Sequence, residues 1–376
     1  MANDLETYTG ILKYHNIQFS FVFDKQELRL IPPSDKVRDV EQWFMIHLGS
    51  GMYTLGNTVY IEDDFLVGKT NETGQTIIFL PSQRQVGRYN SVLFVSINAY
   101  IIKKYNRHQI DRMTFTSAEL DCIYPVAQAL CWSEWSDDGV VYLTTKNFDD
   151  TTTEEQEFFV NDKMVKVQFT ITRTTSSKIG QPPLSLYSTI LLEFDATDDY
   201  SFLYRRWRII KSFIQYLCYR KNINMPQIRL SAPHSEGKHE YFADFFVIEN
   251  TEETEPEELE KGHYIKQQYI SGLEGKILDG IAEDRIYLRH LPQTYCAGRS
   301  IDAARFVMIT AAFEWEFKKT YPDGVRKKES TLVVEKAASE AIETLFENSS
   351  GKLRDKYRYL KKRVKMTRSN LKLSRS

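Results

Sequence analysis

Residues 9–23 read TGILKYHNIQFSFVF, and the second half of this stretch decides the fold class of the N-terminal part of the chain. Ile17, Phe19, Phe21 and Phe23 are apolar at every second position, and the residues between them are mostly polar. A period of two places these four side chains on one face of an extended strand. The stretch therefore predicts a strand whose apolar face packs on a core.

Similar short runs, such as NTVYIED, QTIIFLP, SVLFVSI, MVKVQFTITRT and STILLEFDA, continue to about residue 245 and are separated by polar turn signals. Many short strands with polar turns are typical of an antiparallel sandwich or a barrel-like sheet. We predict an α+β protein in which residues 1–248 form an antiparallel, β-rich, sandwich-like domain with one packed helix. A mixed α+β domain is the alternative.

The packed helix is expected within residues 198–223. Its apolar face comprises Phe202, Leu203, Trp207, Ile210, Phe213, Ile214 and Leu217. Arg205, Arg206, Arg208 and Lys211 occupy the opposite face. An amphipathic helix that closes one side of the sheet explains both faces, and a basic strip for nucleic acid is the alternative.

Residues 249–262 carry seven Glu and one Lys, which predicts a solvated acidic linker. We therefore place a helical domain at residues 263–376. Within it, residues 300–317 read SIDAARFVMITAAFEWEF and are apolar nearly all round a helix, which is typical of a helix buried in a bundle. Glu314 lies among aromatic residues and is expected to be a buried charge paired with Lys or Arg.

The end of the chain is strongly basic. Residues 351–376 contain 11 Lys and Arg and one Asp, a balance of +10, so that the preceding residues carry −12 of the net charge of −2. The expected last helix has one apolar stripe that can pack, and the rest of its surface is basic. Its candidate RNA-binding residues are Lys361, Lys362, Arg363, Lys365 and Arg368. A solvated face of a bundle helix is the alternative.

Common catalytic motifs are absent from the sequence, including the phosphate loop, the HExxH zinc motif and the GxSxG elbow. The seven His residues show no metal-ligand spacing, so we expect no metal and no cofactor. One spacing is suggestive, because Arg285 and His290 fall on an expected helix. Arg could neutralise a phosphate while His exchanges the proton of a ribose 2′-hydroxyl. An ordinary surface or packed His is the alternative.

The four cysteines are far apart and form no CxxC pair, which favours reduced thiols in the cytoplasm. The N-terminus lacks the pattern of a signal peptide. No uncharged apolar run approaches the roughly 18 residues of a membrane span. We expect a soluble cytoplasmic protein with no membrane contact.

Several segments resemble the ApeA-like family of HEPN-domain proteins. They are RFVMITAAFEWEF, preceded by YLRHLP, and DRMTFTSAELDCIYP followed by ILLEFDATDDYSFLYRRWRIIKSFIQYLCYRKNINMPQIRL. The similarity covers nearly the whole chain. It implies a β-rich N-terminal domain and a partial, C-terminally truncated HEPN helical bundle. HEPN domains of this kind are often metal-independent ribonucleases that act as dimers, several of them in anti-phage defence.

The family motif, Arg-x4–6-His, should follow the basic helix, but no His follows His290, so neither Arg285 nor His290 takes a catalytic role from it. In its complete form the protein is expected to be an RNA endonuclease of the anti-phage, abortive-infection type, and a homodimer through the helical domain. The alternative is a non-catalytic sensing or binding module whose β domain recognises a phage or host ligand. A carbohydrate-binding sandwich, suggested by Trp132 and Trp135, is a third reading.

Overall fold

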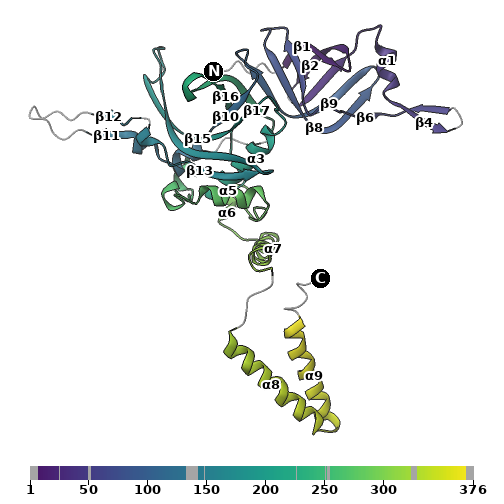
Figure 1. Cartoon of the computed structure of the whole chain (residues 1–376), viewed down its shortest axis with the longest axis vertical. Coiled ribbons are helices and arrows are strands. Elements are labelled where there is room, and N and C mark those ends of the chain that lie inside the picture. Colours follow the sequence, from purple (N-terminus) through teal and green to yellow (C-terminus); the bar gives the residue numbers. More distant parts are fainter. Residues whose placement is uncertain are drawn as a thin grey trace, which may run out of the picture. The chain divides into compact units, whose positions relative to one another are not determined.

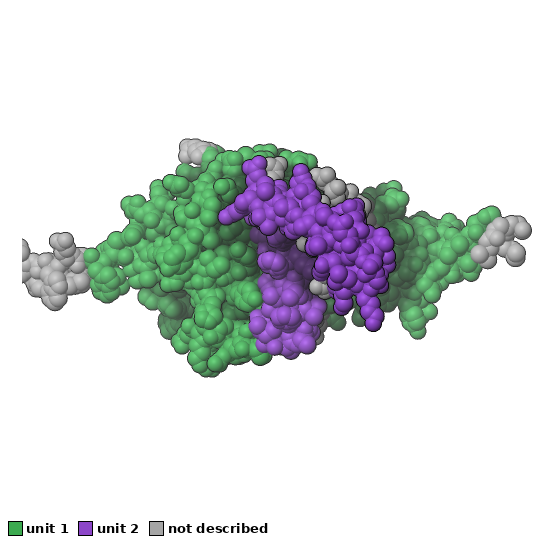
Figure 2. Space-filling view, turned by 90° about the horizontal axis from the view of Figure 1, so that it is seen from below, with its two compact units in different colours: residues 1–284, 291–300 green, residues 285–290, 301–376 purple. Residues whose placement is uncertain are grey.

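A computed structural model describes residues 7–24, 26–49, 52–132, 143–147, 149–225, 227–249, 251, 255–322 and 328–369 (Figure 1). The chain divides into two compact units, coloured separately in Figure 2. Unit 1 comprises Met1–Asp284 and Leu291–Ser300, and unit 2 comprises Arg285–His290 and Ile301–Ser376. Strands dominate the N-terminal region and helices the C-terminal region, which confirms the predicted α+β class.

The first part of unit 1 is a closed six-stranded barrel. Its strands are β1 (Thr7–Tyr14), β2 (Ile17–Asp24), β3 (Glu27–Ile31), β7 (Leu66–Thr70), β8 (Thr76–Tyr89) and β9 (Val92–Lys103). They pair in the order β9-β3-β2-β1-β7-β8, and β8 pairs with β9 again, so the ring closes and leaves no free edge. Phe19, Phe21 and Phe23 are buried in the barrel core, which confirms the strand predicted from their spacing.

Local sequence sets the register of the barrel. Tyr14 pairs with Ile17, so β1 and β2 are joined by a turn of His15 and Asn16. Both turn residues have positive φ, 45° and 62°, as a tight hairpin turn requires. Four short elements follow β3 in the chain: α1 (Val37–Gln42), β4 (Met45–Gly49), β5 (Met52–Leu55) and β6 (Thr58–Tyr60). Strand β6 pairs with β8, and β4 and β5 form a separate hairpin.

The second part of unit 1 is an open antiparallel sheet in the order β13-β14-β15-β10-β16-β17-β9. Its further strands are β10 (Ile110–Thr116), β13 (Gln156–Val160), β14 (Lys163–Thr175), β15 (Leu184–Thr197), β16 (Ile228–Pro233) and β17 (His239–Val247). A separate hairpin is formed by β11 (Leu130–Trp132) and β12 (Leu143–Thr145).

The predicted sandwich is therefore wrong in detail, because the region is a barrel and an open sheet that share β9. This strand of 12 residues is long enough to serve both. The part from Leu93 to Ser96 pairs with β3, and the part from Ala99 to Lys103 pairs with β17. The two parts have separate hydrophobic cores.

Helix α3 (Leu203–Cys218) packs on one face of the open sheet, as predicted. The expected basic strip is interrupted, because Arg206 and Lys211 are buried. The guanidinium of Arg206 lies 3.9 Å from the ring centroids of both Phe194 and Phe202. Lys211 forms an ion pair with Glu249. Two of the four expected basic side chains thus serve packing.

Further helices complete unit 1: α2 (Ala118–Ile123), α4 (Pro256–Lys261), α5 (Glu274–Ala282) and α6 (Tyr295–Gly298). Helix α5 covers the outer edge of β13, where the backbone N–H of Phe159 donates to Asp279 at 2.7 Å. The compact unit thus extends past the acidic linker predicted at residues 249–262, because α5 packs on the sheet.

Unit 2 contains α7 (Ala303–Thr320), α8 (Glu329–Glu347) and α9 (Gly351–Ser369). Helices α8 and α9 pack together, and Lys361 of α9 forms an ion pair with Glu343 of α8. Helix α7 does not have the buried surroundings predicted for it, since Ala312 is its one buried residue in the described chain. Glu314 is exposed, so the prediction of a buried charge is wrong for the single chain. With little packed around α7, this carboxylate stays in solvent and needs no buried partner.

Candidate functional site

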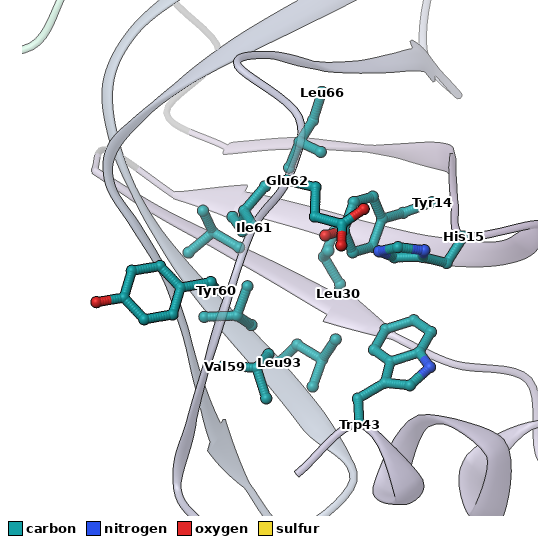
Figure 3. A pocket seen from close by; sticks show the side chains of 12 residues that line it. Tyr14, His15, Leu30, Trp43, Val59, Tyr60, Ile61, Glu62, Leu66 and Leu93 are labelled. Carbon is teal, nitrogen blue, oxygen red and sulfur yellow. The ribbon is translucent and has the colours of Figure 1, made fainter.

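One end of the barrel contains a cavity of about 270 Å³ (Figure 3). Its lining residues are Tyr14, His15, Leu30, Trp43, Val59, Tyr60, Ile61, Glu62, Leu66, Val86, Leu93 and Val95. The inner wall consists of aliphatic side chains from the barrel core. The polar groups come from the β1–β2 turn and from the segment after β6, so the cavity combines an apolar wall with a polar mouth.

Aromatic rings form one side of this barrel pocket. The ring of Trp43, at the end of α1, lies 5.8 Å from that of Tyr14 and 5.2 Å from that of His15. The planes of Tyr14 and Trp43 are nearly perpendicular, at 88°. In Figure 3 the side chains of Tyr14, His15 and Glu62 lie close together above Trp43. Their π faces and the carboxylate together can attract a positive charge.

Burial raises the pKa of Tyr14, and the nearby charges of Asp63 and Glu62 add to this effect, while a backbone hydrogen bond from Glu62 opposes it. The phenol therefore stays protonated at neutral pH and can offer a hydrogen bond. Glu62 itself is exposed, and no ion pair to it is found in the described chain. The pocket mouth thus carries a carboxylate that a bound cation could approach.

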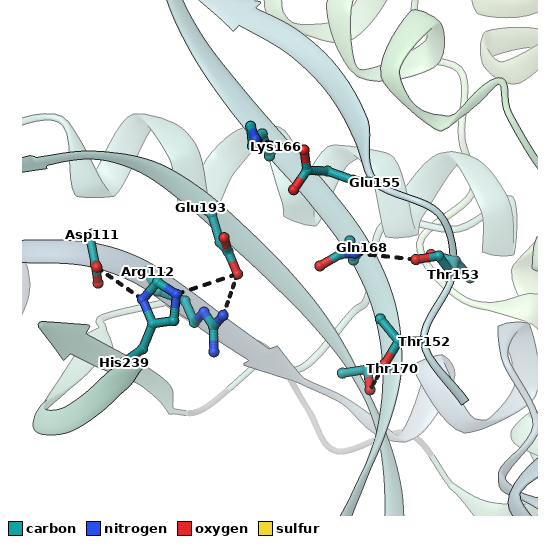
Figure 4. Close-up of polar contacts among 10 residues, drawn as sticks. All are labelled: Asp111, Arg112, Thr152, Thr153, Glu155, Lys166, Gln168, Thr170, Glu193 and His239. Carbon is teal, nitrogen blue, oxygen red and sulfur yellow. Dashed lines mark hydrogen bonds and ion pairs between the residues drawn. The ribbon is translucent and has the colours of Figure 1, made fainter. Parts of the chain in front are cut away.

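A second polar arrangement lies on the open sheet, on the face shown in Figure 4. Nδ1 of His239 on β17 lies 2.9 Å from the carboxylate of Asp111 on β10. Its Nε2 lies 3.8 Å from the carboxylate of Glu193 on β15, which also binds Arg112. The imidazole thus lies between two carboxylates. Sequence reasoning missed this cluster, since its members come from three distant strands and share no spacing.

A groove of about 560 Å³ lies where β10 ends beside β15. Its lining residues are Thr116, Ser117, Ala118, Glu119, Asp121, Thr174, Tyr187, Ser188, Asn224, Gln227 and Arg229. Glu119 is buried and forms an ion pair of 2.9 Å with Arg220, which fixes α2 against the end of α3. Burial raises the pKa of Asp121, although hydrogen bonds from Ser188 oppose the rise. Sequence spacing gave no signal for this groove either.

The candidate catalytic and RNA-binding residues predicted from the sequence lie in unit 2. Arg285 and His290 were predicted to lie on a helix, and this prediction is wrong. Helix α5 ends at Ala282, and Asp284 has a positive φ of 54°. The ring of His290 stacks on Tyr287 at 6.1 Å, and Tyr287 lies at the same distance from Trp315 of α7. This geometry places His290 against aromatic rings.

Of the five candidate RNA-binding residues, the structure describes one side chain. Lys361 pairs with Glu343 and lies 5.1 Å from the ring centroid of Phe346, so it contributes to packing of α9 on α8. The side chains outside the described part are those of Lys362, Arg363, Lys365 and Arg368. Trp132 is exposed on β11, and Trp135 lies outside the described residues.

In the described parts of the chain, no group of three or more His, Cys, Asp or Glu side chains is placed to hold a metal ion. None of the described helices has the length and apolar character needed to cross a membrane. Comparison with known proteins gave no match to a family model, to a curated protein or to a solved structure. The resemblance to ApeA-like proteins therefore stays a prediction.

Proposed function

We propose that the chain is a sensing or binding module whose β-rich region recognises a small organic cation, or a cationic side chain, in the barrel pocket. The observation that supports this proposal is an apolar cavity with Trp43, Tyr14 and Glu62 at its mouth. Cavities with an apolar wall and a few convergent polar groups are the usual form of small-ligand sites. The alternative ribonuclease reading places its chemistry elsewhere, in the helical region.

The polarity of the pocket argues for a cation with an apolar body. Aliphatic side chains such as Leu30 and Leu93 favour the hydrocarbon part of a ligand. They cannot hydrogen-bond to a charged group placed against them, so the charge of the ligand should lie at the mouth of the pocket. The ring faces of Trp43 and Tyr14 attract positive charge, which contributes about 0.5–2 kcal/mol per contact. Glu62 adds a full negative charge at the mouth.

Choline and its uncharged tert-butyl isostere test the proposal, since they differ in charge at nearly constant shape. We expect choline, and not the isostere, to change the fluorescence of Trp43 in a saturable way. Trp43→Ala should remove the signal and so assign it to Trp43 among the five Trp residues of the chain. Glu62→Gln should weaken binding about tenfold, the effect of roughly 1.4 kcal/mol. Equal responses to both compounds, or none to either, would contradict it.

Tyr89→Ala is the matched control for these variants, because Tyr89 is exposed on barrel strand β8 and does not line the pocket. Its choline binding should equal that of the native chain. Unchanged thermal unfolding of the Glu62→Gln variant would separate a lost contact from a lost fold.

RNA cleavage, which the family resemblance implies, stays a prediction with its own test. If His290 acts as a base on a ribose 2′-hydroxyl, His290→Ala should lower cleavage of a single-stranded RNA by about 10²–10⁴-fold. Tyr287→Phe keeps the ring beside His290 and serves as the control. Cleavage that is unaffected by His290→Ala would remove this residue as a candidate.

A further inference from the structure

The sheet of unit 1 has an open edge inside the groove beside β15. Strand β10 pairs with β15 from Ile110 to Thr116, and Thr116 lies opposite Thr189. Strand β15 continues for five more residues, from Ser188 back to Leu184, while it remains paired with β14 on its other side. No strand of the described chain pairs with β15 on the β10 side along these residues. Among the residues that the structure describes, the sheet therefore lacks one strand segment where β10 stops.

Alternate backbone groups along this edge face away from β14, and the edge enters the groove at Tyr187 and Ser188. The N–H of Ser188 donates to Oδ1 of Asp121 at 2.7 Å, so it faces away from β14. Because the hydrogen-bonding direction alternates along an antiparallel strand, the N–H and C=O groups of Leu186 and Leu184 face the same way. Asp121 thus takes the first position that a neighbouring strand would occupy, and no described strand takes the next positions.

We propose that this edge of β15 binds an extended peptide segment of a partner protein, which adds to the sheet as a strand in line with β10. The open residues 184–188 span about 16 Å at roughly 3.3 Å per residue, enough for a segment of about five residues. Main-chain hydrogen bonds supply the affinity in this mode of recognition, and alternate side chains supply the specificity.

Of the charged side chains that line the groove, Arg229 favours an acidic residue in that peptide, whereas the carboxylate of Asp121 lies at the N–H of Ser188. Arg229 is exposed, and its Nη1 lies 3.4 Å from the hydroxyl of Tyr187. No carboxylate of the described chain forms an ion pair with Arg229. The carboxylate of Glu119 is already neutralised by Arg220. An acidic side chain on the polar face of the added strand would therefore meet Arg229, where it can form a charge-assisted hydrogen bond.

A designed probe follows from this geometry: fluorescein-labelled acetyl-Thr-Val-Glu-Val-Thr-Val-amide. When Glu and Thr lie on the face of Tyr187 and Arg229, the alternation puts Val on the opposite face of the sheet. We expect saturable binding by fluorescence anisotropy below about 1 mM, the weak end of specific recognition. A peptide with Lys in place of Glu should bind about tenfold more weakly, and a peptide whose two inner Val residues are Pro should not bind.

Two protein variants locate the site. Arg229→Ala should weaken binding of the Glu peptide about tenfold and leave the Lys peptide unchanged. Arg29→Ala is the matched control, because Arg29 is an exposed barrel arginine paired with Glu27, far from the groove in sequence and fold. It should bind both peptides as the native chain does.

Hydrogen exchange gives a readout that does not depend on any variant. The amides of Leu186 and Leu184 should become protected when the Glu peptide binds, while the amide of Tyr187, already bonded to β14, should not change. Three results would overturn the proposal: no saturable binding, equal binding of the proline peptide, or binding without protection of Leu186.

Discussion

Asp121 lies in an environment that disfavours the ionised form of its carboxyl group. It accepts a hydrogen bond from the backbone of Ser188, yet burial raises its pKa above the ordinary carboxyl value. The folded state therefore binds more protons than the unfolded state over the interval between the two pKa values. Stability contributed by this group is greatest at low pH and falls as pH rises through that interval.

Asp121→Asn removes the titration and keeps an oxygen that can accept from Ser188. The quantity to compare is the free energy of unfolding of the variant minus that of the native chain. This difference should increase as pH rises above about 4, the pKa of the carboxyl in the unfolded chain, and should become constant above the pKa of Asp121 in the folded chain. Urea unfolding at a series of pH values measures it. A difference for Asp121→Asn that does not change with pH would refute the expectation.

At the scale of elements, α5 protects the edge of β13 by a very close approach. A Cβ atom added at Gly275 would lie 2.2 Å from the carbonyl oxygen of Glu157, which leaves no room for any other residue. The same helix supplies Asp279 to the N–H of Phe159. An edge covered in this way cannot pair with another chain, in contrast to the edge of β15.

Gly275→Ala should therefore destabilise unit 1, although Ala is the better helix former by about 1 kcal/mol. Overpacking against backbone costs about 1–3 kcal/mol, so we expect a net loss of up to about 2 kcal/mol in urea unfolding. Exchange of the Phe159 amide should also become faster. Gly87→Ala is the control, because the nearest atom to its added Cβ would be 3.9 Å away. Equal stability of the two variants would show that α5 does not pack on β13.

Local elements were predictable from the sequence where one periodic pattern decided them. The alternation at Phe19 and Phe21 predicted β2, and the spacing of Trp207 and Phe213 predicted the buried face of α3. Closure of the barrel was not predictable, because it depends on β9 pairing with both β3 and β8, and no local signal specifies two partners. The same reason hid the cluster around His239, whose partners are brought together by the sheet.

Helix α7 shows the opposite failure, because its apolar pattern predicted burial but the described residues leave most of it exposed. An all-round apolar helix predicts burial without saying what covers it. In the single chain Phe306 is 61% exposed and Phe313 is 71% exposed. At the scale of the whole molecule, we therefore expect α7 to be covered by a second copy of the chain, as the predicted homodimer requires.

The variant Phe306→Ser with Phe313→Ser tests this expectation. It should lower the mass measured by light scattering from that of a dimer to that of a monomer, because two large apolar contacts are lost. Tyr89→Ser changes a similarly exposed aromatic residue on the barrel and should leave the mass unchanged. A native chain that is already monomeric at high concentration would contradict the role given to α7.

Because the two parts of unit 1 share strand β9, we expect them to assemble in a fixed order. All six barrel strands lie between residues 7 and 103, so the barrel is complete before the rest of the sheet has been made. Strand β17, the direct neighbour of β9 in the open sheet, follows more than a hundred residues later. Since chains emerge from the ribosome N-terminus first, the finished barrel presents the second half of β9 as a ready template for the later strands.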